Sequence, residues 1–331
     1  MIANTTHRHR LLNAALLLAG VLAGGPLQAQ TYFESLAQAQ AQHSEPNVAD
    51  PFNDSEYVSR EGPSAQGRID ARADSDHQAT VYNAAAHAWS QVDVAGIHIS
   101  AFSQSVAGGS GPKNANAQAN ASGFFRDQFA LSVPGAAAGT LFTVTAQLRS
   151  HGFIYATTTP GWTGAFQQNR ADAVTSWQSW TRVLSPGGSK LAEVRAGQDC
   201  VESTAFGSPP GCQDSGSIGL STVSFMMASG GASVELDMRG WASAVSSVNQ
   251  VIGMVQAEGA ADLSNTVAWA GVVSLQDASG AAVLDYTLNS STSGFDYRNA
   301  YVSAVPEPAT AALWLGGLAL IGGALRRRQA H

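Results

Sequence analysis

Residues 142–149 read FTVTAQLR, and apolar and polar side chains alternate through this stretch one for one. Residues 234–239, VELDMR, repeat the pattern. A period of two puts every second side chain on the same side of an extended chain. Both stretches therefore predict β-strands that bury one face and expose the other.

A third alternating stretch lies near the C-terminal end of the body. Apolar residues alternate from Val267 to Leu275, and they are followed by the turn residues DASG at 277–280 and by a second alternating run from Ala282 to Leu288. This order predicts a β-hairpin with a four-residue turn. Several short strands, separated by Gly, Ser, Asn and Pro and without regular helical segments between them, predict a mainly β fold. We expect an antiparallel β-sandwich or jelly-roll-like body over residues 79–304.

The segment before this body has a different composition. Thr31 and Glu34 have the spacing of a helix capping box, and Ala and Gln, both good helix formers, follow up to Gln42. We expect a short N-terminal helix there. Residues 43–78 mix charges with Pro46, Pro51 and Pro63, which predicts that residues 30–78 form a helix and a loop-rich lead-in.

The composition excludes some classes of partner. The chain has 331 residues, of which 44% are hydrophobic and 12% charged, with a formal net charge of -7. Charged residues normally make up about a quarter of a soluble protein. The negative charge and the presence of only two lysines, Lys113 and Lys190, argue against a nucleic-acid partner.

The first 29 residues have the pattern of a secretory signal peptide. Residues 7–10, HRHR, are basic, residues 11–23 are apolar except for Asn13, and Leu27-Gln28-Ala29 forms a cleavage site that ends in a small residue. We therefore expect export through the cell membrane and a mature chain that begins near Gln30.

The last 27 residues, VPEPATAALWLGGLALIGGALRRRQAH, have three parts. Pro306, Glu307 and Pro308 come first, the apolar run 309–325 follows, and Arg326, Arg327 and Arg328 come last. Seventeen helical residues span about 25 Å, slightly less than the hydrocarbon core of about 30 Å. We expect a single transmembrane helix whose arginines stay cytoplasmic, with the body on the periplasmic side before processing.

This tail resembles the PEP-CTERM sorting signal of Gram-negative bacteria, in which Pro-Glu-Pro, a hydrophobic helix and an Arg-rich end follow one another. The resemblance covers residues 305–331. It implies an exosortase-type membrane protease or transpeptidase as partner, cleavage near Pro306–Pro308, and delivery of the body to the cell surface or an exopolysaccharide matrix. The alternative is a plain single-pass anchor with a proline-rich stem.

Export also bears on the two cysteines and on one acidic cluster. Cys200 and Cys212 would meet an oxidising compartment, where we expect them to form a disulfide. Asp70, Asp74 and Asp76 could hold a cation, but a solvated acidic loop is the simpler interpretation. We predict no metal site and no cofactor.

The sequence contains no recognisable catalytic motif, and we do not expect an enzyme. A binding role remains open, because the aromatic residues Trp162, Trp177 and Trp180 would either form a glycan-binding platform or fill the core. Thr157–Thr159 raise ice binding as a weaker alternative. We expect an exported surface or biofilm-matrix protein with a structural or adhesive role.

Overall fold

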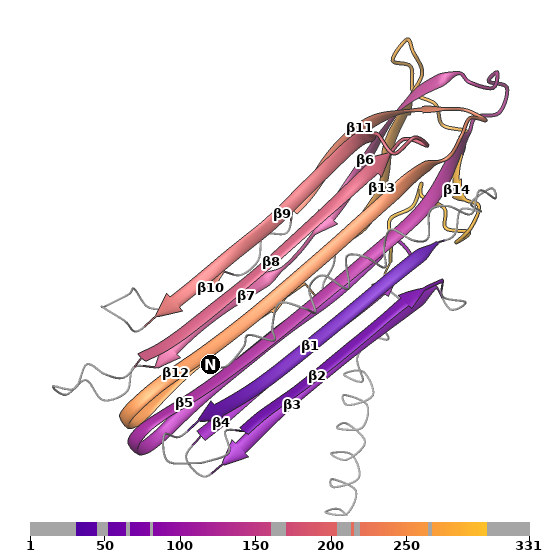
Figure 1. Ribbon diagram of the computed structural model, residues 1–331. Helices are drawn as coiled ribbons and strands as arrows, with labels where there is room; N and C mark the ends of the chain where they lie inside the picture. The colour runs from indigo at the N-terminus through magenta and orange to yellow at the C-terminus, as the bar shows by residue number, and fades with distance from the viewer. Residues whose placement is uncertain are drawn as a thin grey trace, which may run out of the picture. The chain divides into compact units, whose positions relative to one another are not determined.

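The computed structural model describes residues 31–44, 52–63, 67–79, 82–159, 170–203, 213–214, 219–263 and 267–302. All regular elements in these ranges are strands of an antiparallel sheet (Figure 1). Among the described residues, no helix has the length and apolar character needed to cross a membrane. The mainly β, antiparallel fold predicted from the alternating stretches is confirmed.

The strands follow one another along the chain with short connections. They are β1 (Tyr32–Ser44), β2 (Phe52–Gly62), β3 (Arg68–Ala79), β4 (Tyr82–Asp93), β5 (Gly96–Ser132), β6 (Leu141–Ser150), β7 (Phe153–Thr159), β8 (Arg170–Leu184), β9 (Lys190–Ser203), β10 (Gln213–Asp214), β11 (Gly219–Ala228), β12 (Val234–Asp262), β13 (Val267–Gln276) and β14 (Thr287–Ser290).

Two very long strands, β5 and β12, organise the sheet. They pair with each other from Phe129 opposite Val234 to Ser100 opposite Asp262. The register shifts between Gln250 and Ile252, where both strands turn back in the rounded bends at the lower left of Figure 1. Each of these two strands therefore has one half in one layer and the other half in a second layer.

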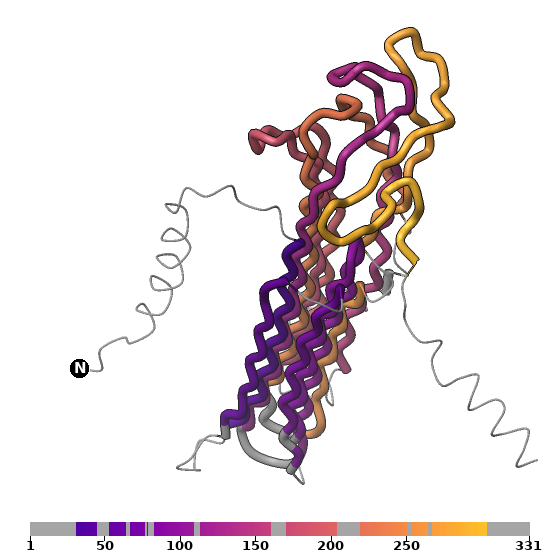
Figure 2. Tube along the Cα trace, turned by 90° about the vertical axis from the view of Figure 1, so that its right-hand side faces the viewer, coloured from indigo at the N-terminus to yellow at the C-terminus, as the bar shows by residue number. Residues whose placement is uncertain are grey.

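Layer 1 contains the second half of β5 and the first half of β12. Its order is β2, β1, β5, β12, β8, β9. Layer 2 contains the other halves, in the order β3, β4, β5, β12, β7, β10. Beyond the end of β12, β13 takes its place beside β5, and β6 pairs with β13 where β7 pairs with β12. β11 pairs with β6. Figure 2 shows the strands stacked in two layers, in agreement with the predicted sandwich.

Small side chains fill much of the space between the layers. The fully buried alanines of layer 1 include Ala37, Ala39, Ala41, Ala117, Ala119, Ala121, Ala242 and Ala244, and those of layer 2 include Ala73, Ala86, Ala107 and Ala257. Buried serines link the layers: the Ser35 hydroxyl donates to the Ser90 carbonyl at 2.8 Å, and the Ser105 hydroxyl donates to the Ser246 carbonyl at 3.0 Å. A serine side chain is short, so the layers lie much closer here than the usual separation of about 10 Å.

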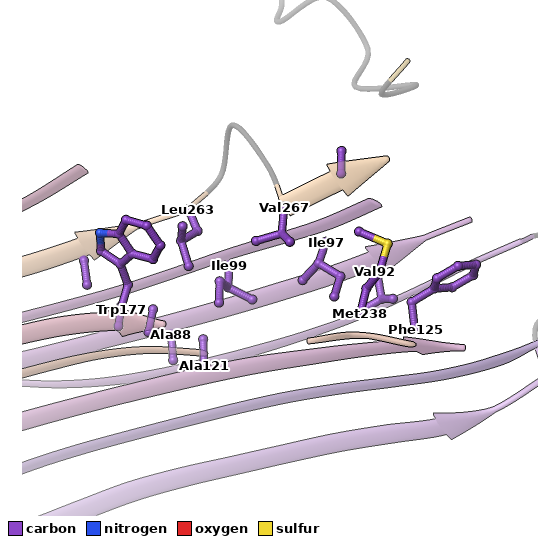
Figure 3. Close-up of a cluster of buried hydrophobic side chains, with 14 of the residues drawn as sticks. Ala88, Val92, Ile97, Ile99, Ala121, Phe125, Trp177, Met238, Leu263 and Val267 are labelled. Carbon is purple, nitrogen blue, oxygen red and sulfur yellow. The ribbon is translucent and has the colours of Figure 1, made fainter. Parts of the chain in front are cut away.

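Larger side chains occupy the interior toward the other end of the layers. Figure 3 shows Val92, Ile97 and Ile99 of layer 2 in the same cluster as Phe125 and Met238 of layer 1, and all five are buried. Gly123 provides space for them, because a Cβ at this position would lie 2.7 Å from Ile97 Cγ2 and 2.9 Å from Val92 Cγ2. Sterically, Gly123 is therefore part of the core.

The predicted N-terminal helix is wrong. Residues 32–44 form β1, whose side chains alternate between the interior and the outer face. Ala and Gln alternate in this stretch with a period of two, so the alanines fit against layer 2 while the glutamines point outward. Packing between the layers outweighed the helix propensity of these residues.

Two further predictions about the backbone need correction. The loop-rich lead-in is instead made of β2 and β3, the edge strands of the two layers. The predicted hairpin keeps its turn, in which the Asp277 carboxylate accepts hydrogen bonds from the amides of Ser279 and Ala281. Its returning strand is reduced to a short pairing, in which Ala282 bridges to Gln276 and the Val283 amide donates to the Leu275 carbonyl at 2.9 Å, and β14 pairs with β5 instead.

Candidate binding surface

Over about half of their length, the central strands β1, β5 and β12 of layer 1 have an uncharged outer face. We call this surface the amide face, because amide and hydroxyl side chains lie next to each other across the strands. It consists of Gln38, Gln40, Gln42, Asn114, Asn116, Gln118, Asn120, Ser243, Val245, Ser247 and Asn249. Apart from Val245, these side chains both donate and accept hydrogen bonds, and all but the buried Ser243 are at least partly exposed, so this surface can contact polar, uncharged ligands.

Aromatic and arginine side chains continue the outer face toward the other end of the strands. Phe124, Arg239 and Trp180 lie directly opposite one another on β5, β12 and β8. The Arg239 guanidinium lies 4.6 Å from the Phe124 ring centroid and 5.6 Å from that of Trp180. Tyr32 extends the row, with its ring centroid 5.8 Å from that of Phe124. Cation–π contacts hold these rings in place on the sheet.

A hollow of about 460 Å³ opens beside Trp180, over β8 and β9. We call it the Gly197 notch. Its lining residues are Gln178, Ser179, Trp180, Arg182, Arg195, Ala196, Gly197, Gln198 and Asp199. Gly197 lies opposite Gln178, and a Cβ at position 197 would lie 3.2 Å from Gln178 Cγ. The notch exists because this strand position has no side chain.

Charges at the notch largely balance. Glu193 contacts Arg182 Nε at 3.1 Å and Lys190 Nζ at 3.3 Å, and it also pairs with Arg195. The hydrogen bond from Arg195, together with Lys190, lowers the pKa of Glu193 despite some opposing desolvation. Asp199 adds an exposed carboxylate at the opposite end of the notch. The notch thus combines an indole ring with hydrogen-bond donors and acceptors and has little net charge.

The structure separates the three predicted glycan-binding tryptophans. Trp177 is 1% exposed and packs in the core near Gly152 and Leu263, so of the two alternatives for this residue core filling is correct and glycan binding is not. The side chains of β8 alternate, which turns Trp177 inward and Trp180 outward. Trp162 lies outside the described residues. Trp180 is the member of this set that reaches the candidate surface.

The acidic cluster lies on the edge strand β3 rather than in a loop. Asp74 pairs with Arg72 at 2.7 Å and with His87 at 2.9 Å. Burial would raise the pKa of Asp74, but the hydrogen bonds from Arg72 and His87 outweigh it and lower the pKa. No group of His, Cys, Asp and Glu side chains suited to a metal is found within the described ranges. Charges on an edge strand oppose sheet-to-sheet aggregation, and this explains the position of Asp70, Asp74 and Asp76.

Other predicted residues fall in or near undescribed segments. Cys200 is buried on β9, whereas Cys212 lies outside the described residues, so the disulfide stays a prediction. Pro306, Glu307, Pro308 and Arg326–Arg328 also lie outside them, as do the signal peptide and the predicted transmembrane helix. Thr157–Thr159 lie on β7, but Thr158 turns inward and its hydroxyl donates to Glu202 at 2.9 Å. This stretch therefore does not present three threonines on one face.

Sequence reasoning missed a buried carboxylate, Asp127 on β5, which is 0% exposed. Its hydrogen-bond donors come from both ends of the described body. They are the hydroxyls of Thr31 (3.1 Å), Ser290 (2.9 Å), Thr292 (2.6 Å), Ser293 (2.6 Å) and Tyr297 (2.8 Å), together with the Gln128 amide (2.8 Å). Burial and Asp127 raise the pKa of Tyr297 well above its usual value, so this hydroxyl stays a donor. We call this group the Asp127 cluster.

The Asp127 cluster fastens the last part of the body to the sheet. Further contacts act in the same place: the Trp269 indole donates to the Tyr297 carbonyl at 2.7 Å, and the Tyr301 hydroxyl donates to Asp93 at 2.7 Å. Apart from its neighbour Gln128, the donors to Asp127 are 96 to 170 residues away in sequence, so no local sequence motif predicts the cluster. Its hydrogen-bonding capacity is used within the body, which indicates a structural role.

Comparison with protein families matches residues 304–328 to the PEP-CTERM protein-sorting motif. Comparisons with curated proteins and with solved structures found no match. The family match agrees with the resemblance of the tail and does not extend into the strands described above. The chain carries a C-terminal PEP-CTERM protein-sorting motif, which supports its export, processing by the membrane enzyme exosortase and delivery to the surface.

Proposed function

We propose that this protein is a structural or adhesive component of the cell surface or extracellular matrix, delivered there by the exosortase route. The observation that carries the proposal is the amide face, which lies on β1 and the two longest strands, directly above an interior of small, closely packed side chains. A wide, uncharged surface on a firmly packed two-layer body suits many weak contacts to a hydrated polymer. The proposal assigns no reaction to the body.

The layout of the termini supports the same role. Thr31 and residues 290–297 meet at Asp127, and the sorting motif begins shortly after the last described residue, Val302. Pro306 follows Tyr301 by five residues, and each residue spans at most about 3.5 Å even in a fully extended chain. Cleavage near Pro306–Pro308 would therefore fall only a few residues after a part of the body that is held by many hydrogen bonds, and this is a suitable point for attachment or release.

Replacing Pro306, Glu307 and Pro308 with alanine in the producing bacterium tests the proposal. We expect the variant to accumulate unprocessed in the membrane fraction while the wild-type body reaches the surface or matrix. A control variant, Pro63→Ala, changes a proline far from the motif and should behave like the wild type. Equal processing and equal surface delivery of the triple variant would instead favour the plain-anchor alternative.

A further inference from the structure

We propose that the Gly197 notch binds a single pyranose ring of a neutral polysaccharide. This inference rests on the proposed function and names the ligand class of its adhesive surface. The notch lies on the same outer face as the amide face, and its volume of about 460 Å³ falls within the usual range of ligand pockets, about 300–1,000 Å³. It offers one defined contact point for a polymer that the amide face then contacts more loosely.

The side chains of the notch match the chemistry of a sugar ring. A pyranose has an apolar face of C–H groups and a rim of hydroxyls. The Trp180 indole supplies a flat apolar partner, since it lines the notch and is supported on its β12 side by Arg239 at 5.6 Å. Gln178, Arg195 and Asp199 supply donors and acceptors around it, as sugar hydroxyls require.

Electrostatics favour a neutral ligand over an anionic one. The positive charges of Arg182, Arg195 and Lys190 are opposed by Glu193, which pairs with all three, and by Asp199. An anionic sugar would have to compete with Glu193 for these guanidinium groups and would approach the Asp199 carboxylate. A neutral ring avoids both costs and uses the polar side chains as hydrogen-bond partners.

The position of the notch allows a long chain to enter. Within the described residues, β9 pairs with β8 alone and forms the edge of layer 1, so the sheet does not continue beyond the notch on that side. The next outward position of β8 toward the amide face is Ser176, a small side chain opposite Asp199. A polysaccharide can thus occupy the notch with one ring and extend over the amide face with others.

The test uses mature protein purified from the producing bacterium and the exopolysaccharide of the same bacterium, separated by anion exchange into neutral and acidic fractions. Affinity electrophoresis in gels containing each fraction gives apparent dissociation constants. Trp180→Ala removes the stacking ring, and Gly197→Gln fills the notch while leaving Trp180 in place. Phe153→Ala is the matched control, because Phe153 is an exposed aromatic residue on β7 of layer 2, away from the amide face.

We expect the wild type and Phe153→Ala to bind the neutral fraction equally, and both notch variants to bind about tenfold or more weakly. Circular dichroism and urea unfolding show that the variants are folded. Unchanged binding by both notch variants, or binding confined to the acidic fraction, would overturn the inference. Measuring how much of each variant is retained in the matrix distinguishes the notch proposal from the proposed function. Normal matrix retention with unchanged glycan affinity would refute the notch alone, whereas absence of the wild type from surface and matrix would refute the proposed function.

Discussion

Replacing Asp127 with asparagine should destabilise the C-terminal part of the body. Oδ2 of Asp127 accepts the hydroxyls of Ser293 at 2.6 Å and Tyr297 at 2.8 Å. In Asp127→Asn, with the amide nitrogen in place of Oδ2, this atom can no longer accept: two hydrogen bonds to a charged group, worth about 1.5–3 kcal/mol each, are replaced by neutral ones that the amide donates to the hydroxyl oxygens, worth about 0.5–1.5 kcal/mol each. The carboxylate is fully buried, so solvent does not screen the loss. Removing the buried charge also removes its desolvation penalty, which offsets part of this loss. We therefore expect a net loss of about 2 kcal/mol in the free energy of unfolding.

Two measurements on purified mature protein check this value. Urea unfolding gives the change in the free energy of unfolding, and hydrogen exchange locates it. Amides of residues 288–302 should exchange about 30-fold faster in Asp127→Asn, as expected for 2 kcal/mol, while the strands around Ala119 keep most of their protection. Asp70→Asn is the control, because Asp70 is an exposed carboxylate of the edge strand β3. A difference below about 0.5 kcal/mol between the two variants would refute the structural role of the Asp127 cluster.

Three further predictions concern the core, the C-terminal contacts and pH. Ala119→Leu inserts a large side chain between the closely spaced layers, and urea unfolding should show a loss of about 3 kcal/mol, whereas retained stability would mean that the layers can separate easily. Gly96→Ala places a Cβ against the edge of the Tyr301 ring, 2.6 Å from its Cζ, so exchange near Tyr301 should accelerate; an unchanged pattern would show that this ring moves without cost. The hydrogen bond from Arg298 lowers the pKa of Asp296. The stability that the ionised Asp296 adds to the folded state is therefore present above about pH 4 and is lost as the pH falls through the lowered pKa. Protection of residues 296–299 should be constant from about pH 7 to 5 and fall at lower pH in the wild type, with a weaker fall in Arg298→Gln.

The alternating stretches predicted β6, the first part of β12 and β13, because one-face burial leaves a period of two in the sequence. In β6 every second residue is buried, and in β12 Val234, Leu236 and Met238 are buried, together with Asp237 between them. The same logic failed for β1, where alanine was taken as a helix former although it serves here as a small core residue. Closely spaced layers select alanine and serine inside, and these residues carry a weak hydrophobic signal.

Only part of the candidate surface could be predicted from the sequence. Trp180 was recognised as an aromatic candidate, but its separation from Trp177 depends on the register of β8, which decides which face each ring joins. The notch depends on Gly197 lying opposite Gln178 on a neighbouring strand. The Asp127 cluster joins residues from both ends of the body. Cross-strand and long-range pairings of this kind are products of the fold and leave no local pattern.

The intact mass of the protein recovered from the surface or matrix of the producing bacterium tests the account most directly. The account predicts a chain that begins near Gln30 and ends near Pro306–Pro308, without the apolar run 309–325 and the three arginines. Recovery of the body only from the membrane fraction, with a mass that includes the residues up to His331, would contradict it.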